Sequence, residues 1–142
     1  MILVDTNLLV YATDKDSPQH TRARVWFEEH LSSARPVGLA WIVVLGFLRV
    51  TTRPGVLRRP YTPEQAFDFV DEWLAQPYVS LVAPGDNHWP LLRNLLKATG
   101  TAGNLVADAH LAALAIEHGC AIYSADNDFK RFPGVEHVNP LA

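Results

Sequence analysis

Three aspartates occupy positions at which a carboxylate could do chemistry. Asp5 directly follows the apolar run at residues 2–4, and Asp126 comes just after another short apolar run. Asp108 lies within the largely apolar stretch 104–118, where we expect it on or beside the buried face of a helix. Carboxylate oxygens suit Mg²⁺ or Mn²⁺, and such a cation can activate water for attack on a phosphate. Three converging carboxylates would therefore indicate metal-dependent hydrolysis of a phosphate ester.

Each aspartate also has a purely structural interpretation. Asp5 is a suitable N-cap for a helix that follows it. A buried Asp108 could be compensated by an arginine instead of a cation, because an unpaired buried charge is costly. The sequence Asp126-Asn127-Asp128 is typical of turns and helix starts. One of these acids alone would not identify a site, whereas all three in one place would.

The placement of the three aspartates depends on short strands that alternate with helices. Apolar runs predict strands at residues 2–4, 37–41, 79–82, 121–124 and 136–138. Helical spacing and capping residues predict helices at residues 8–11, 17–34, 42–52, 62–74, 89–98 and 104–118, with a helical turn at 126–132. Ser17 is the expected N-cap of the second helix. The buried side of the helix that begins at Thr62 is expected to contain Ala66, Phe67, Val70, Trp73 and Leu74.

This alternation favours an α/β fold with a mostly parallel central sheet of about five short strands flanked by helices, forming a single domain over residues 1–142. In such open sheets, ligands bind outside the carboxyl ends of the strands. That rule selects Asp5 and the segment 124–126. Together with Asp108, they are expected to converge at one edge of the sheet.

The composition is that of an ordinary globular protein. The chain has 142 residues, 49% of them hydrophobic and 19% charged, with a net charge of −3. A mildly acidic total argues at first against a nucleic-acid binder, which usually has a basic domain. The single cysteine, Cys120, cannot form an internal disulfide, so we expect a reducing, cytoplasmic location. No apolar run is long enough to span a bilayer, so no membrane role is expected.

Three segments of the chain resemble the PIN-domain nucleases, and in particular the VapC-type toxins of bacterial toxin–antitoxin pairs. These segments are the opening MILVDTNLLVYA, the stretch ADAHLAALAIEHG from Ala107, and SADNDF from Ser124. The resemblance continues through the chain to Asn139 and Pro140. It implies a PIN-like fold and a metal-dependent endoribonuclease that cleaves RNA by attack of water.

The resemblance also implies roles for individual residues and partners. Asp5, Asp108 and Asp126 are the expected catalytic residues and ligands of Mg²⁺ or Mn²⁺. Thr6 and Ser124 are expected to support them through their hydroxyl groups, with Asp128 as a further acid. The implied partners are an RNA substrate, a second copy in a homodimer and a small cognate antitoxin that blocks the site, all in the bacterial cytoplasm.

The chain departs from the family pattern at Gly46. The family usually has an acid, commonly Glu, near the start of the helix after the second strand, and residues 30 to 63 contain no acid at all. A metal ligand is therefore expected to be missing. The alternative function is a weakened or inactive PIN-like module that binds RNA or antitoxin. A phosphatase with Asp5 as nucleophile is disfavoured because position 7 is Asn and not a second Asp.

The acid-free stretch is a candidate RNA-binding region. It contains five arginines, for a charge of +5, which leaves −8 for the rest of the chain. Four of these arginines follow the second strand and are the expected phosphate-binding residues: Arg49, Arg53, Arg58 and Arg59. Arginine suits planar, bidentate contacts with phosphate. They could equally form an ordinary solvated basic surface, but the acidic total no longer excludes RNA.

Overall fold

The structure, a computed structural model that describes all 142 residues, is built on a five-stranded parallel sheet. The strands are β1 (Ile2–Val4), β2 (Val37–Ala40), β3 (Val79–Val82), β4 (Ala121–Tyr123) and β5 (His137–Val138). Their order in the sheet is β3-β2-β1-β4-β5, and every neighbouring pair is parallel. The predicted α/β fold class is confirmed, and the sheet is entirely rather than mostly parallel.

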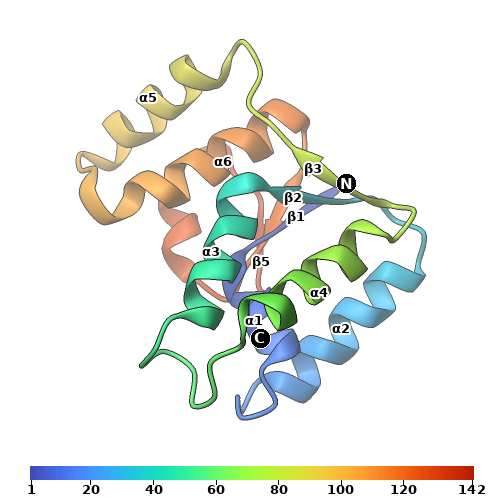
Figure 1. Ribbon diagram of the computed structural model, residues 1–142. Helices are drawn as coiled ribbons and strands as arrows, with labels where there is room; N and C mark the ends of the chain where they lie inside the picture. Colours follow the sequence, from blue (N-terminus) through green and yellow to red (C-terminus); the bar gives the residue numbers. More distant parts are fainter.

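Six helices connect the strands: α1 (Thr6–Thr13), α2 (His20–Ser32), α3 (Trp41–Thr52), α4 (Pro63–Leu74), α5 (His88–Thr99) and α6 (Val106–His118). The chain moves outward from β1 to β2 to β3 and then crosses back to β4. Because parallel connections are right-handed, α2 and α4 cover one face of the sheet, and α5 and α6 lie on the other side (Figure 1). No helix is long and apolar enough to cross a membrane.

The central strand β1 lies at the point where the chain reverses its direction across the sheet. It pairs with β2 on one side and with β4 on the other. Leu3 and Val4 are completely buried. β2 approaches β1 and β3 closely at Gly38, where a Cβ atom would lie 2.6 Å from side-chain atoms of both Leu3 and Val82. Glycine is therefore required there. Because β2, β1 and β4 are parallel neighbours, their carboxyl ends lie at the same edge of the sheet.

Helix α6 lies deep in the protein. It is preceded by the short 3-10 helix η1 (Gly103–Leu105), so the predicted helix over 104–118 begins as two elements and ends as expected at Gly119 in a left-handed conformation. Leu111 and the four residues after it are buried. A helix that is apolar on most sides is typical of a core position. An acid on such a helix must lie where the helix leaves the core, and Asp108 is in its first turn.

Two details differ from the sequence prediction. Helix α2 begins at His20 and not at Ser17, because the Ser17 hydroxyl bonds to Gln19 within a separate turn. On α4, the residues Ala66, Val70 and Trp73 are buried as expected, but Phe67 and Leu74 are 49% and 37% exposed. Phe67 and Leu74 are seven positions apart on a side of the helix that no other element covers.

Candidate active site

Asp5 lies at the carboxyl end of β1, where its carboxylate is held by three donors. Its Oδ1 accepts a hydrogen bond of 2.7 Å from the Thr6 backbone N–H, so the residue is indeed the N-cap of α1. Its Oδ2 accepts a bond of 2.7 Å from the Ser124 hydroxyl and a longer one, 3.4 Å, from the Asn7 amide. Asp5 is therefore an N-cap, as its structural interpretation predicted. It also lines a cavity, so the capping role does not exclude a catalytic one.

Ser124 and Asn7 connect the end of β1 to the end of β4. The Asn7 amide donates to the Ser124 Oγ at 3.2 Å, and the Asn7 Oδ1 accepts from the Ala125 backbone N–H at 3.2 Å. The Ser124 Oγ also accepts from the backbone N–H of Asp126 at 3.0 Å. Ser124 is completely buried. This network orients both Asp5 and Asp126.

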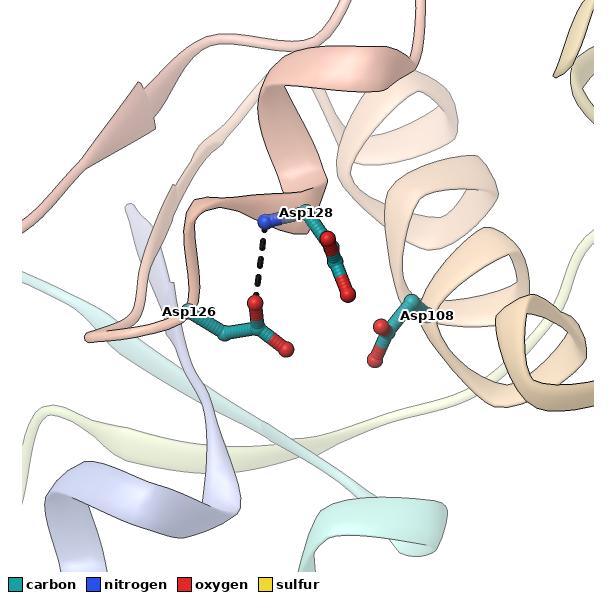
Figure 2. Close-up of side chains that lie close together, drawn as sticks. All are labelled: Asp108, Asp126 and Asp128. Carbon is teal, nitrogen blue, oxygen red and sulfur yellow. Dashed lines mark hydrogen bonds between the residues drawn. The ribbon is translucent and has the colours of Figure 1, made fainter.

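The carboxylates of Asp108, Asp126 and Asp128 face one another. Figure 2 shows Asp108 reaching from α6 toward the other two, which come from the segment after β4. One oxygen from each of the three lies within 4.8 Å of the others. Asp126 caps the short 3-10 helix η2 (Asn127–Arg131) by accepting from the Asp128 backbone N–H at 2.9 Å. We call Asp108, Asp126 and Asp128 the acidic cluster.

The acidic cluster carries negative charge that nothing in the chain neutralises. The two ion pairs of the molecule, Arg59 with Asp16 and His88 with Glu117, lie elsewhere. The pKa of Asp108 is raised to about 6, mainly because burial disfavours its charged form and also because Asp5, Asp126 and Asp128 are nearby. Burial also raises the pKa of Asp5, against the hydrogen bonds from Ser124 and Thr6 that lower it.

Asp5 and Asp108 line a common cavity of about 430 Å³ where α1, α3 and α6 meet. Its other lining residues are Thr6, Asn7, Val10, Tyr11, Ile42, Val43, Gly46, Arg49, Val50, Ala107 and Leu111. The Thr6 hydroxyl donates to the Val43 carbonyl at 3.2 Å, so it faces α3 and not the acidic cluster. We call this space the active-site cavity.

The donor set fits a hard divalent cation. Three carboxylates that all offer oxygens at one place repel one another when ionised, and a bound Mg²⁺ or Mn²⁺ would remove that repulsion. The structure thus brings Asp108 and Asp126 together with Asp128, which we expect from the sequence only as a further acid. Asp5 lies beside this group and shares the active-site cavity with Asp108.

The predicted RNA-binding arginines are divided between two places. Arg49 lines the active-site cavity, whereas Arg53 and Arg58 do not. Arg59 lies beyond the far end of α1, where its Nε is 3.5 Å from the Asp16 carboxylate. Only Arg49 is thus positioned to contact a substrate that has entered the cavity.

Two residues of the site were not singled out from the sequence. Asn7 joins β1 to β4 as described, and His137 on β5 donates from Nε2 to the Ser124 carbonyl at 2.9 Å. For Asn7 a signal exists, because a polar amide two residues after Asp5 is placed at the same sheet edge. Nothing in the sequence marks His137, whose role follows from the pairing of β4 with β5.

Comparisons with known proteins identify the family. Residues 2–135 match the PIN domain. Ribonuclease VapC37 of Mycobacterium tuberculosis is 44% identical over 142 residues, which cover 100% of this chain and 99% of the relative. Ribonuclease VapC33 of the same species is 40% identical over 141 residues, 99% of each chain.

Among solved structures, VapBC2 from Rickettsia felis bound to a DNA fragment from their promoter has a TM-score of 0.70 at 21% identity, covering 98% of each chain. At that identity the likeness shows the fold. The sequence relatives show more, because they are 40% and 44% identical to this chain over nearly its whole length. The chain therefore belongs to the PIN-domain family and, within it, to the VapC ribonucleases.

Proposed function

We propose that this protein is the toxin of a toxin–antitoxin pair, a metal-dependent endoribonuclease that hydrolyses phosphodiester bonds of RNA. The acidic cluster is the observation that carries this proposal, because three oxygens within 4.8 Å of one another at the carboxyl edge of the sheet can hold a divalent cation. Membership in the VapC ribonucleases supports the same reaction and substrate.

The residues divide the work as follows. Asp108 and Asp126 would hold Mg²⁺ or Mn²⁺, with Asp5, which lies beside them, as the third ligand and Asp128 as a further acid within reach. The bound cation would activate water and stabilise the charge on the attacked phosphate. The Ser124 hydroxyl orients Asp5 through their 2.7 Å hydrogen bond, and the Thr6 backbone N–H fixes the other Asp5 oxygen. The protein thus supplies a rigid set of carboxylates to a single place.

The departure at Gly46 leaves this ligand set intact. Asp5, Asp108 and Asp126 are all present and lie outside α3, after β1, on α6 and after β4. The alternative of an inactive binding module is therefore not favoured. The acid that the family usually has at this position would lie on the wall of the active-site cavity. Its replacement by Gly46 does not change the acidic cluster.

RNA contacts extend from the cavity along the acid-free stretch. We assign a phosphate contact to Arg49, with weaker contributions from Arg53, Arg58 and Arg59 on the loop after α3. Phosphate contacts of this kind supply most of the sequence-independent affinity for nucleic acid. The solved toxin VapC20 of M. tuberculosis, described as cleaving the sarcin–ricin loop, has a TM-score of 0.62 with this chain at 18% identity over 92% of this chain and 93% of that one. A structured RNA is therefore the first substrate to test.

Two protein partners complete the proposal. Structures of VapBC complexes share this fold, so we infer a small antitoxin partner that covers the site. We also infer a homodimer. Trp41 and Leu45, one turn apart on α3, are 53% and 57% exposed, and large exposed apolar side chains on one helix face are typical of interfaces. Both associations would take place in the bacterial cytoplasm.

Cleavage of structured RNAs with and without Mg²⁺ or Mn²⁺ tests the activity. We expect cleavage that requires the metal and is lost in Asp5→Asn and Asp108→Asn proteins. The matched control is Asp71→Asn, which changes an exposed acid of α4 and should cleave normally. Undiminished cleavage by both folded active-site variants would contradict the proposal.

A further inference from the structure

Arg49 is the one cationic side chain that lines the active-site cavity. It is exposed and takes part in neither of the two ion pairs of the molecule, although two carboxylates line the same cavity. An RNA strand that approaches the acidic cluster meets repulsion from Asp5, Asp108 and Asp126. A fixed positive charge inside the cavity offsets that repulsion, and Arg49 is the residue placed to provide it.

Gly46 lets α3 pack closely against α1 at the wall of the active-site cavity. It is buried in α3 and precedes Arg49 by three residues, about one helical turn or 4.5 Å along the axis, so the two positions share a side of the helix. A Cβ at position 46 would lie 2.9 Å from the Thr6 Oγ1. The Thr6 backbone N–H in turn is 2.7 Å from the Asp5 carboxylate. A side chain at position 46 would therefore press against Thr6 and move α3, with Arg49, away from α1 and Asp5.

We propose that Arg49, held at the cavity wall by the close packing of α3 on α1 at Gly46, binds one backbone phosphate of the RNA, next to the phosphodiester that is hydrolysed at the acidic cluster. This inference rests on the proposed ribonuclease function, and it adds the position at which the protein binds the RNA backbone. Arg49 supplies a guanidinium that can donate two parallel hydrogen bonds to phosphate oxygens. Gly46 brings the helix that carries Arg49 close to Thr6 and Asp5. Arg49 is thus a substrate-binding residue.

Binding of a fluorescently labelled single-stranded RNA, measured by anisotropy in the cleavage-deficient Asp108→Asn background, tests the Arg49 contact. We expect Arg49→Gln to weaken binding about tenfold, as for loss of a hydrogen bond to a charged group. The plot of log affinity against log salt should become shallower by about 0.7, the change for one lost phosphate contact on a single strand. A folding defect would not change this slope.

The matched control is Arg35→Gln. Arg35 precedes β2 and thus lies at the opposite edge of the sheet, where its Nε bonds only to the Ser33 hydroxyl. We expect its affinity and salt slope to stay within twofold of the background. An Arg49→Gln protein that behaves like the Arg35→Gln protein would overturn the inference.

A double-mutant cycle tests the pairing with Gly46. Gly46→Leu should weaken RNA binding by pushing α3 and Arg49 away from α1, and adding Arg49→Gln should weaken it little further, because both changes remove the same phosphate contact. If Gly46→Leu does not fold, Gly46→Ala provides a smaller change with the same expected coupling. Independent, additive losses would contradict the positioning of Arg49 by Gly46.

The inference and the proposed function fail in different ways. Metal-dependent RNA cleavage by the unmodified protein, combined with normal RNA binding by Arg49→Gln, would overturn only the phosphate site. Absence of both RNA cleavage and RNA binding in the unmodified protein would overturn both.

Discussion

Helix α6 carries two acidic side chains in different surroundings. Glu117 has hydrogen-bond partners within the chain, whereas Asp108 lies among other carboxylates. Toward α5, the Glu117 Oε1 pairs with the His88 Nδ1 at 2.8 Å, and its Oε2 accepts from the Gly85 N–H at 3.0 Å. His88 Nε2 also shares a hydrogen bond of 2.8 Å with His110 Nδ1. Toward the sheet edge, Asp108 faces only other carboxylates at close range.

The contrast separates a stabilising group from a functional one. In the His88–Glu117 pair, charges and hydrogen bonds are satisfied within the chain, so the pair fastens α5 to α6. At Asp108, burial and the neighbouring carboxylates raise the free energy of the ionised, metal-free protein. A bound cation would lower that free energy. Unsatisfied charge held in rigid surroundings is typical of functional sites.

The largest expected effect that tests this contrast is that of Asp108→Asn. Removing a metal ligand should lower RNA cleavage by about a thousandfold or more, because the metal supplies several kcal/mol of transition-state stabilisation. The metal-free protein should unfold at the same temperature as the unmodified one, or higher, since a repelled charge is gone. Cleavage rates and thermal unfolding measure the two effects, and a marked loss of stability would show that Asp108 is structural.

His88→Ala should show the reverse behaviour. Glu117 is left with one partner in a mostly buried position, which should cost about 1–3 kcal/mol in the free energy of unfolding. RNA cleavage at a temperature where the variant is folded should change less than twofold. Denaturant unfolding and cleavage assays decide this, and a large loss of activity in the folded variant would extend the active site to α5.

Ser124→Ala should give an intermediate result. Asp5 loses the 2.7 Å hydrogen bond that orients it, worth about 1–1.5 kcal/mol, so cleavage should fall about tenfold. The matched control is Ser80→Ala on the exposed side of β3, which should cleave normally. Equal rates for the two variants would mean that the hydrogen bonds from Thr6 and Asn7 are enough to position Asp5.

The smallest expected effect is the pH dependence of stabilisation by Mg²⁺. In the metal-free protein, the raised pKa of Asp108 makes its contribution to stability fall as pH rises from about 4 to 6. Binding of Mg²⁺ requires the carboxylate, so its stabilisation should be present above pH 6 and fade below it. At a tenfold excess over Kd it amounts to about 1.4 kcal/mol.

Thermal unfolding with and without Mg²⁺ at pH 7.5 and pH 5 measures this difference. Asp108→Asn is the control, and it should lose most of the dependence on pH. An equal Mg²⁺ effect at both pH values would place the bound cation away from Asp108.

The fold and the acids were predictable from the sequence for a clear reason. Apolar runs mark the strands, and in a parallel sheet the residues just after them meet at one edge, which places Asp5 and Asp126 together. Asp108 stands out because the residues one helical turn away from it, Leu105, Leu111 and Ala112, are apolar.

What could not be predicted depends on spatial neighbours. The bridge from Asn7 to Ser124 spans 117 positions and exists only once β1 pairs with β4. Likewise, Phe67 is 49% exposed because no other element packs against that side of α4. Apolar spacing along the sequence does not show which apolar side chains another element covers.

The hydrogen bond between Ser124 and Asp5 joins residues 119 positions apart, and β4 is inserted next to the first strand of the chain. During translation, β1 leaves the ribosome long before β4 has been made. A nascent chain that lacks the segment from β4 onward has neither Ser124 nor Asp126, and its Asp5 has no partner from that strand. The full set of residues at this edge of the sheet therefore comes together only after β4 and the segment that follows it have been made.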